Sequence, residues 1–210
     1  LKGKLEGGSY EIRGDIRSQF ITGLLFALPL AMQDSTIEVV GGLNSASYIA
    51  MTIDALEKAG IYIEQSGNIF RIPSKQKYAL LDELAVESDW SSAAFWLVAG
   101  VVGNNPITVK GLNTKSLQGV RNIIAHLCKM GAYIENTPDG YVAMPSQLFG
   151  AEIDCKDTPD LLPILSVAAA AAKGKTTFFN VGRLRYKESD RLAAMQEALA
   201  ACGIQSEIGD

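Results

Sequence analysis

Apolar residues recur at intervals of three and four in three segments of the chain, and a glycine follows each segment. The apolar positions are Ile49, Ile53 and Leu56, then Val120, Ile124 and Leu127, and then Leu192, Met195 and Leu199. This spacing is typical of one buried face of an amphipathic helix. The glycines are Gly60, Gly131 and Gly203. Because glycine suits the left-handed position after the last turn of a helix, the pattern predicts three helices that end at these residues.

An earlier helix is predicted in each of the three segments, because an aspartate or serine precedes an apolar run there. Such residues commonly cap a helix by accepting hydrogen bonds from free backbone N–H groups. The expected helices run from Asp15 or Ser18 to Ala31, from Asp89 or Ser91 to Gly103, and from Asp157 or Asp160 to Ala172. A short stretch of strand-forming residues follows each helix, at 36–40, 107–110 and 176–180. These stretches predict strands.

The chain therefore repeats one structural unit, and the aligned glycines place three copies about 70 residues apart. Each unit is expected to contain a strand, a helix, a strand, a helix and one or two further strands. The helix near 164–172 is apolar on nearly every side, and helices of that kind are normally buried. We expect an α/β protein with helices inside and sheets outside. A repeat protein without catalytic function would show the same periodicity, although it would not explain polar clusters at the helix N-termini.

Composition narrows the possible partners and compartments. The chain of 210 residues has a formal net charge of −4, which argues against a nucleic-acid or membrane-surface partner. The apolar runs 20–32 and 161–172 are too short to span a bilayer, and no signal peptide is visible. We therefore expect a cytoplasmic protein whose three cysteines are reduced and mostly packed. The sequence has no starting methionine and stops in an extended-looking stretch, so it is expected to be a piece of a longer protein.

A dense group of charged side chains at 184–191 lies directly before the last of the glycine-terminated helices, and it reads Leu-Arg-Tyr-Lys-Glu-Ser-Asp-Arg. Ser189 or Asp190 can cap that helix. Lys187 and Arg191 then lie at the positive end of the helix dipole, where an anion is bound favourably. A structural cap needs only one serine or aspartate, so the additional charges indicate an anion site. The alternative is a solvated helix start with local ion pairs.

The sequence Lys-Glu-Ser-Asp-Arg at 187–191 resembles the signature of the EPSP synthases, the enolpyruvyl transferases that act on shikimate 3-phosphate. The resemblance extends from Gly14 to Gly203. It implies an inside-out α/β barrel, in which each of two lobes is built from three βαβαββ units around buried parallel helices. The stretch 86–93 resembles the family's crossing between lobes. Residues 1–86 are therefore expected to form one repeat unit of the first lobe, and residues 87–210 two repeat units of the second.

The resemblance implies transfer of an enolpyruvyl group from phosphoenolpyruvate to the 5-hydroxyl of shikimate 3-phosphate, giving EPSP and phosphate. This is a step of the shikimate pathway of aromatic amino acid biosynthesis. The chemistry requires a base near the hydroxyl, an acid near the methylene carbon, and cations for phosphates and carboxylates. It requires no metal or other cofactor. The two substrates are the expected partners. Further family elements have no match here, so the fragment is expected to be inactive alone and either marginally stable or self-associating.

The catalytic residues implied by the resemblance are in the third unit. Asp160, in a Thr-Pro-Asp sequence, is similar to the family's aspartate that contacts the attacking hydroxyl, and it is the expected general base. Glu188 is the expected proton donor. Lys187 is expected to bind the ring oxygens of shikimate 3-phosphate or to balance charge. Arg191 is expected to bind phosphoenolpyruvate.

The other substrate contacts implied by the resemblance are in the first unit. Ser18 and Gln19 match the family's Ser-Ser-Gln-Phe element, in which Arg17 here replaces the first serine. All three are expected to bind shikimate 3-phosphate, and Gln19 is also expected to contact phosphoenolpyruvate. Ser45 and Tyr48 are similar to the family's Ser-x-x-Tyr element, in which the serine meets the phosphate of shikimate 3-phosphate and the tyrosine lies nearby. Both are expected to bind shikimate 3-phosphate. Considered alone, the two serines are also compatible with simple helix caps.

Two other functions are compatible with the sequence. A related transferase that adds enolpyruvate to UDP-N-acetylglucosamine would share the repeat, although the run at 187–191 together with Ser18 and Gln19 favours the shikimate enzyme. The second alternative is a non-catalytic repeat module with the same fold.

Overall fold

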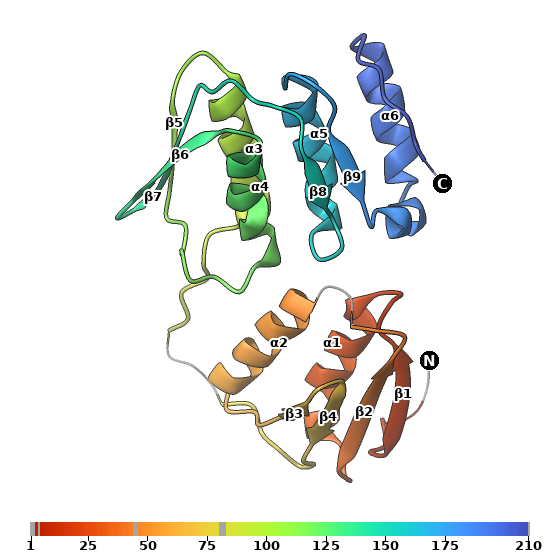
Figure 1. Ribbon diagram of the computed structural model, residues 1–210. Helices are drawn as coiled ribbons and strands as arrows, with labels where there is room; N and C mark the ends of the chain where they lie inside the picture. The colour runs from red at the N-terminus through yellow and green to blue at the C-terminus, as the bar shows by residue number, and fades with distance from the viewer. Residues whose placement is uncertain (1–2, 4, 44–45, 80–82, 210) are drawn as a thin grey trace. The chain divides into compact units, whose positions relative to one another are not determined.

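Helices and strands alternate along most of the chain (Figure 1). The computed structural model describes residues 3, 5–43, 46–79 and 83–209. The chain divides into two units, Leu1–Val86 and Glu87–Asp210. Each unit combines helices with sheets, so the prediction of an α/β protein is confirmed.

The first unit contains a four-stranded sheet and two helices. The strand order is β1 (Ser9–Arg13), β2 (Ser35–Val40), β4 (Ile69–Ile72) and β3 (Glu64–Ser66). Strands β1 and β2 are parallel and the other pairs are antiparallel. The helices are α1 (Ser18–Ala27), which continues into the 3₁₀ turn η1 (Leu28–Leu30), and α2 (Ala46–Lys58). One cluster of buried side chains joins the two helices to the sheet, including Ile21, Leu25, Ile37, Ile49, Leu56 and Phe70.

The second unit contains two small sheets. Strands β5 (Ile107–Lys110), β7 (Gly140–Met144) and β6 (Tyr133–Thr137) form an antiparallel sheet in that order. Strands β8 (Glu152–Asp154) and β9 (Thr177–Phe179) form a parallel pair. Residues 204–209 have no strand partner among the described residues, so the extended segment expected after the last helix forms no strand. A strand requires a neighbour that accepts and donates its backbone hydrogen bonds.

The helices of the second unit pack around α5. They are α3 (Trp90–Val102), α4 (Ile123–Lys129), α5 (Leu162–Ala170) and α6 (Arg191–Ala201). Three 3₁₀ turns, η2 (Gly119–Asn122), η3 (Pro159–Leu161) and η4 (Gly182–Tyr186), precede α4, α5 and α6. Helix α5 contacts α3, α4 and α6. Five of its residues are buried, in agreement with its apolar sequence. In the part of the chain that the structure describes, no helix is both long and apolar enough to cross a membrane.

The three glycines end their helices in the same way. Gly60, Gly131 and Gly203 have φ values of +76°, +93° and +77°. The N–H group of the residue after each glycine donates to a carbonyl in the last turn, as from Ala132 to Leu127 at 3.0 Å. This is the Schellman arrangement, in which a left-handed residue closes the helix. The predicted helix ends are therefore confirmed.

We predict that Gly131→Ala lowers the free energy of unfolding by about 1–2 kcal/mol, because a side chain disfavours the left-handed conformation. Gly182→Ala is the control, since Gly182 lacks a left-handed φ and an added Cβ meets no atom within 4 Å. Both tryptophans, Trp90 and Trp96, lie in α3 of the second unit, so urea denaturation followed by tryptophan fluorescence reports on that unit. Equal stability of the two variants would contradict this account of the helix end.

Two of the predicted helix starts are wrong in detail. Ser18 is the first residue of α1 rather than its cap, and Arg17, at the cap position, makes no side-chain cap hydrogen bond. Neither Asp157 nor Asp160 caps α5, which begins after η3 with no side-chain cap. Each of η3 and α5 has a proline among its first residues. Proline lacks a backbone N–H, so fewer donors there require a cap.

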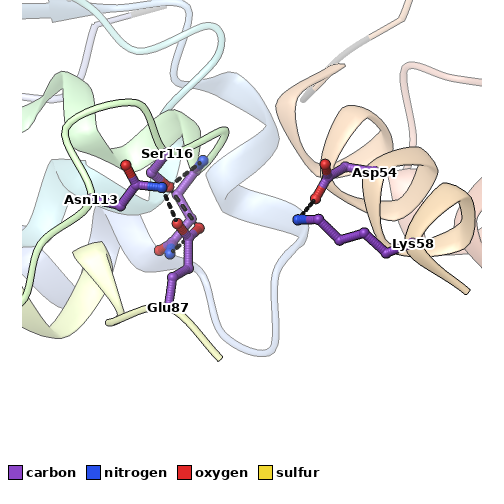
Figure 2. Close-up of polar contacts among 6 residues, drawn as sticks. Asp54, Lys58, Glu87, Asn113 and Ser116 are labelled. Atoms are coloured by element: carbon purple, nitrogen blue, oxygen red, sulfur yellow. Dashed lines mark hydrogen bonds and ion pairs between the residues drawn. The ribbon is translucent and has the colours of Figure 1, made fainter. Parts of the chain in front are cut away.

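Asp89 caps the start of α3 as predicted, and the neighbouring Glu87 forms further hydrogen bonds there. Asp89 caps α3 by accepting from the N–H groups of Ser91 at 2.8 Å and Ser92 at 3.0 Å. Glu87 accepts from the side chains of Ser116, Gln118 and Asn113 at 2.7, 2.9 and 3.2 Å. Figure 2 shows the Glu87 contacts and, in the first unit, the ion pair of Asp54 and Lys58 at 2.5 Å within α2. The Glu87 contacts hold the loop 113–118 against the first residues of α3.

The Asp89 cap predicts a pH-dependent stability. Hydrogen bonds from the Ser92 hydroxyl and from the backbone lower the pKa of the Asp89 carboxyl below its ordinary value. Its contribution to stability is therefore complete above the unfolded pKa of about 4 and is lost as the pH falls through the folded value. We predict that Asp89→Ala costs about 0.5–2 kcal/mol at neutral pH, and that the difference from wild type shrinks below about pH 4. Urea denaturation at a series of pH values measures it, and a difference independent of pH would contradict the assignment.

The cysteines differ from the prediction. All three are free thiols, but Cys128 and Cys202 are exposed and only Cys155 is buried. Burial raises the pKa of Cys155 to about 11. Cys128 and Cys202 lie near the ends of α4 and α6, where an apolar spacing does not ensure a packed neighbour.

One face of α3 carries apolar side chains that are largely exposed. Phe95 and Trp96 are 59 % and 60 % exposed, whereas Ala94, Leu97 and Val98 are buried. We predict that the 210-residue chain self-associates, because exposed apolar surface favours association. Sedimentation equilibrium should show weaker association for the double variant Phe95→Gln, Trp96→Gln than for a control, Tyr62→Gln, which changes an exposed aromatic of the first unit. A stable monomer at every concentration would contradict the prediction.

Candidate functional site

The expected catalytic residues Asp160 and Lys187 lie beside each other in the second unit. They are far apart in sequence, but parallel strands β8 and β9 end at the same edge of their sheet. Residues 155–160 leave β8 at that edge, and residues 180–187 leave β9 there. The Lys187 Nζ atom is 3.1 Å from Asp160 Oδ1 and 3.4 Å from Asp160 Oδ2. The parallel pairing therefore brings a carboxylate and an ammonium group together.

The ion pair of Asp160 and Lys187 is accessible to solvent and to ligands. Their side chains are 36 % and 25 % exposed. Ion pairs of this exposure typically contribute about 0–1 kcal/mol to stability. The pair is therefore better suited to orienting the two side chains than to stabilising the unit.

The charged run before α6 forms the start of that helix. Asp190 caps it by accepting from the N–H groups of Leu192 at 3.0 Å and Ala193 at 3.1 Å. Of the two predicted caps, Asp190 is therefore the observed one. Arg191, the first residue of α6, pairs with Glu188 at 3.2 Å, and Arg185 lies 3.5 Å from Asp190. The cations of this run thus form the local ion pairs that are expected for a solvated helix start, and the same cations could bind an anion.

The described site residues of the first unit lie at the starts of α1 and α2. Ser18 and Gln19 are in the first turn of α1, and Ser18 is only 8 % exposed. Tyr48 is in the first turn of α2 and is 40 % exposed. Arg17 is exposed at the cap position of α1. Ser45 lies outside the described residues.

Three of these side chains border one depression. Ser18, Gln19 and Tyr48 line it together with Thr22, Phe26, Met51, Thr52 and Ala55, and its volume is about 280 Å³. Its lining includes hydroxyl and amide groups together with aromatic and aliphatic side chains. Such a site can hold a small polar ligand by hydrogen bonds from one side.

The candidate site residues thus form two groups, one in each unit. The group in the second unit can exchange protons and bind anions. The group in the first unit can donate hydrogen bonds. Within the described residues, no group of three histidine, cysteine or acidic side chains is arranged to hold a metal ion.

The residues that join the segments leading to Asp160 and Lys187 were not predicted from the sequence. Asp154 and Asn180 join the ends of β8 and β9 through a hydrogen bond of 2.8 Å, and Arg183 contacts the backbone of Lys156 at 2.6 Å. An asparagine at the end of a predicted strand, as Asn180 is in the predicted strand 176–180, is a signal for a left-handed turn. That signal could have identified Asn180, but nothing in the sequence indicates its partner.

Comparisons with known proteins agree with the sequence resemblance. A family model for EPSP synthase (3-phosphoshikimate 1-carboxyvinyltransferase) matches residues 1–210. The 3-phosphoshikimate 1-carboxyvinyltransferase of Clostridium kluyveri is 45 % identical over 206 residues, which are 98 % of this chain and 48 % of that protein. The protein of the same name from Brachyspira hyodysenteriae is 39 % identical over 213 residues, which are 100 % of this chain and 50 % of that protein. The chain thus spans about half the length of these curated relatives.

Solved structures show a similar fold. EPSP synthase from Acinetobacter baumannii matches with a TM-score of 0.73 and 24 % identity, over 94 % of this chain and 45 % of that one. The enolpyruvyl transferase NikO from Streptomyces tendae matches with a TM-score of 0.68 and 16 % identity, over 84 % of this chain and 44 % of that one. At these identities the likeness concerns the fold alone.

Proposed function

The chain belongs to the EPSP synthase family, and on that premise we propose that it supplies part of an active site for enolpyruvyl transfer. The group moves from phosphoenolpyruvate to the 5-hydroxyl of shikimate 3-phosphate, and EPSP and phosphate are the products. The reaction takes place in the cytoplasm, without a metal or other cofactor. The observation that carries this proposal is the pairing of Asp160 with Lys187 at 3.1 Å, next to the charged start of α6.

In the proposed mechanism, Asp160 is the general base. Its carboxylate accepts the proton of the 5-hydroxyl as the hydroxyl oxygen forms a bond to C2 of phosphoenolpyruvate. Glu188 donates a proton to the methylene carbon, which becomes a methyl group. In the tetrahedral adduct the bond from C2 to the phosphate oxygen then breaks, phosphate leaves, and the methyl group returns a proton to the Glu188 carboxylate. Lys187 orients the Asp160 carboxylate and stabilises negative charge that develops on the attacking oxygen.

Substrate binding is assigned to both groups of residues. Arg191, at the start of α6, binds the anionic groups of phosphoenolpyruvate, because a guanidinium at the positive end of the helix dipole favours negative charge. Arg17, Ser18, Gln19, Ser45 and Tyr48 bind shikimate 3-phosphate, and Gln19 also contacts phosphoenolpyruvate. The depression lined by Ser18, Gln19 and Tyr48 supports this assignment for the described residues. Lys187 also contacts the ring oxygens of shikimate 3-phosphate.

We also propose that both units are built from copies of one repeat. The first unit is then one βαβαββ repeat of one lobe, and the second unit contains two repeats of the other lobe of an inside-out α/β barrel. The fold shared with EPSP synthase from Acinetobacter baumannii supports this arrangement. Because curated relatives are about twice as long, we propose that the chain works within a longer polypeptide and is inactive alone.

A phosphate-release assay tests the proposed function. The full-length protein that carries this chain is supplied with phosphoenolpyruvate and either shikimate 3-phosphate or UDP-N-acetylglucosamine. The expected result is that phosphate is released when the acceptor is shikimate 3-phosphate, and not when it is UDP-N-acetylglucosamine. Release only with the UDP sugar would favour the related transferase, and release with neither substrate would favour a non-catalytic repeat module.

A further inference from the structure

The two catalytic segments of the second unit are tied together where they leave the sheet. Asp154 is the last residue of β8, and Asn180 directly follows β9. Asp154 Oδ1 accepts hydrogen bonds from Asn180 Nδ2 at 2.8 Å and from the backbone N–H of Lys156 at 2.9 Å. Asp154 therefore connects the segment that leads to Asp160 with the segment that leads to Lys187.

A second contact joins the same segments further along the chain. Arg183 lies in η4, shortly before Lys187, and its Nη2 donates to the carbonyl oxygen of Lys156 at 2.6 Å. The backbone of Lys156 is thus held on both sides, at its N–H group by Asp154 and at its carbonyl group by Arg183. This fixes the chain four residues before Asp160 relative to η4.

The backbone at Asn180 supports the same interpretation. Its φ is +59°, and it is one of two non-glycine residues with positive φ in the described part of the chain. Asparagine tolerates this conformation better than most residues. A left-handed residue at this point turns the chain sharply out of β9 into η4. Such conformations persist where the surrounding contacts require them.

These hydrogen bonds contribute little to the stability of the core. Asp154 and Asn180 are exposed, and β8 and β9 have only three residues each. A two-stranded sheet of this size is not stable by itself. The core of the unit is formed by apolar side chains that include Ile153, Cys155 and Leu165. The hydrogen bonds therefore act on the geometry of the strand ends more than on folding.

We propose that Asp154, Asn180 and Arg183 form a strand-end clamp that sets the position of Asp160 relative to Lys187. The three are positioning residues, because their clamp contacts are hydrogen bonds to other protein groups and not to the substrates. This inference rests on the proposed function, in which Asp160 is the general base. A displacement of about 1 Å in a reacting group lowers the rate by as much as about 100-fold.

The test measures kcat and KM in the full-length protein for Asn180→Gly, Asp154→Ala and Asp154→Asn. Asn180→Gly retains the left-handed backbone and removes the hydrogen bond. We expect kcat to fall about 10- to 100-fold in Asn180→Gly and Asp154→Ala, with KM for both substrates changed by less than about threefold. Asp154→Asn should recover part of the loss, because its side-chain oxygen still accepts from Lys156. Glu207→Gln is the control, since it breaks the exposed pair with Lys175 in the same unit.

A double-mutant cycle with Asp160→Asn separates positioning from a general structural effect. If the clamp acts through Asp160, Asn180→Gly should lower kcat by much less in the Asp160→Asn background than in wild type. The same fold-loss in both backgrounds would overturn the clamp. So would a wild-type kcat in both Asn180→Gly and Asp154→Ala when the parent protein is active. A parent protein without enolpyruvyl transfer would overturn the proposed function and the clamp with it.

Discussion

Replacing Asp160 with asparagine is expected to lower turnover of the full-length protein by about 10²–10⁴-fold. The substitution retains the size and polarity of the side chain but removes the group that accepts the proton of the 5-hydroxyl. Asp160 lies outside the buried core, with its side chain 36 % exposed. The free energy of unfolding should therefore change by no more than about 1 kcal/mol. Steady-state kinetics of phosphate release together with urea denaturation measure both effects.

Asp157→Asn is the matched control for Asp160→Asn. Asp157 is an exposed acid of the same segment between β8 and η3, and no catalytic function is proposed for it. Its substitution should leave turnover within about a factor of two of wild type. Asp160 is not the general base if Asp160→Asn also retains turnover within that range. Equal losses in the two variants would indicate a general disturbance of the segment.

The second large effect is expected at Arg191. A hydrogen bond to a charged group contributes about 1.5–3 kcal/mol, which corresponds to about 10- to 100-fold in affinity. Arg191→Met should therefore weaken the binding of phosphoenolpyruvate by that factor and the binding of shikimate 3-phosphate by much less. Lys187→Met should mainly lower turnover, because it removes the partner of Asp160. Isothermal titration calorimetry with each substrate and steady-state kinetics distinguish the two variants.

These two substitutions also separate an active site from a solvated helix start. If the ion pairs of Arg191 with Glu188 and of Lys187 with Asp160 were only structural, their loss would cost about 0–1 kcal/mol of stability. Substrate affinity and turnover would then remain unchanged in both variants. Lys175→Met is the control, because Lys175 forms a comparable exposed pair with Glu207 at 3.0 Å. Equal behaviour of all three variants would contradict the assignment.

The features that could be predicted from the sequence depend on neighbouring residues. Gly60, Gly131 and Gly203 end helices because their conformation is set by local backbone sterics, and the observed φ values agree. The caps of α3 and α6 by Asp89 and Asp190 are equally local, since each acid accepts from N–H groups two and three residues ahead. A single sequence therefore contains the information for these elements.

The features that could not be predicted depend on contacts between distant segments. The pairing of Asp160 with Lys187 follows from the parallel alignment of β8 and β9, which a pattern of apolar residues does not specify. The same is true of the hydrogen bond between Asp154 and Asn180. The exposure of Cys128 depends on which face of α4 is covered, and not on the spacing of its apolar residues.

The family resemblance and the structure contribute different parts of the account. The motif at 187–191 resembles the family's signature, and the matches over residues 1–210 show the family. The structure adds the geometry of the second unit, in which a carboxylate, an ammonium group and a guanidinium lie at strand and helix ends.

We propose above that the strand ends of β8 and β9 and the start of α6 form the catalytic part of a substrate site. A crystal structure of the full-length protein with shikimate 3-phosphate and phosphoenolpyruvate bound tests it most directly. We expect the 5-hydroxyl to lie within hydrogen-bond distance of the Asp160 carboxylate, and phosphoenolpyruvate to contact Arg191. Both substrates bound elsewhere, with the pair of Asp160 and Lys187 remote from any reacting atom, would contradict it.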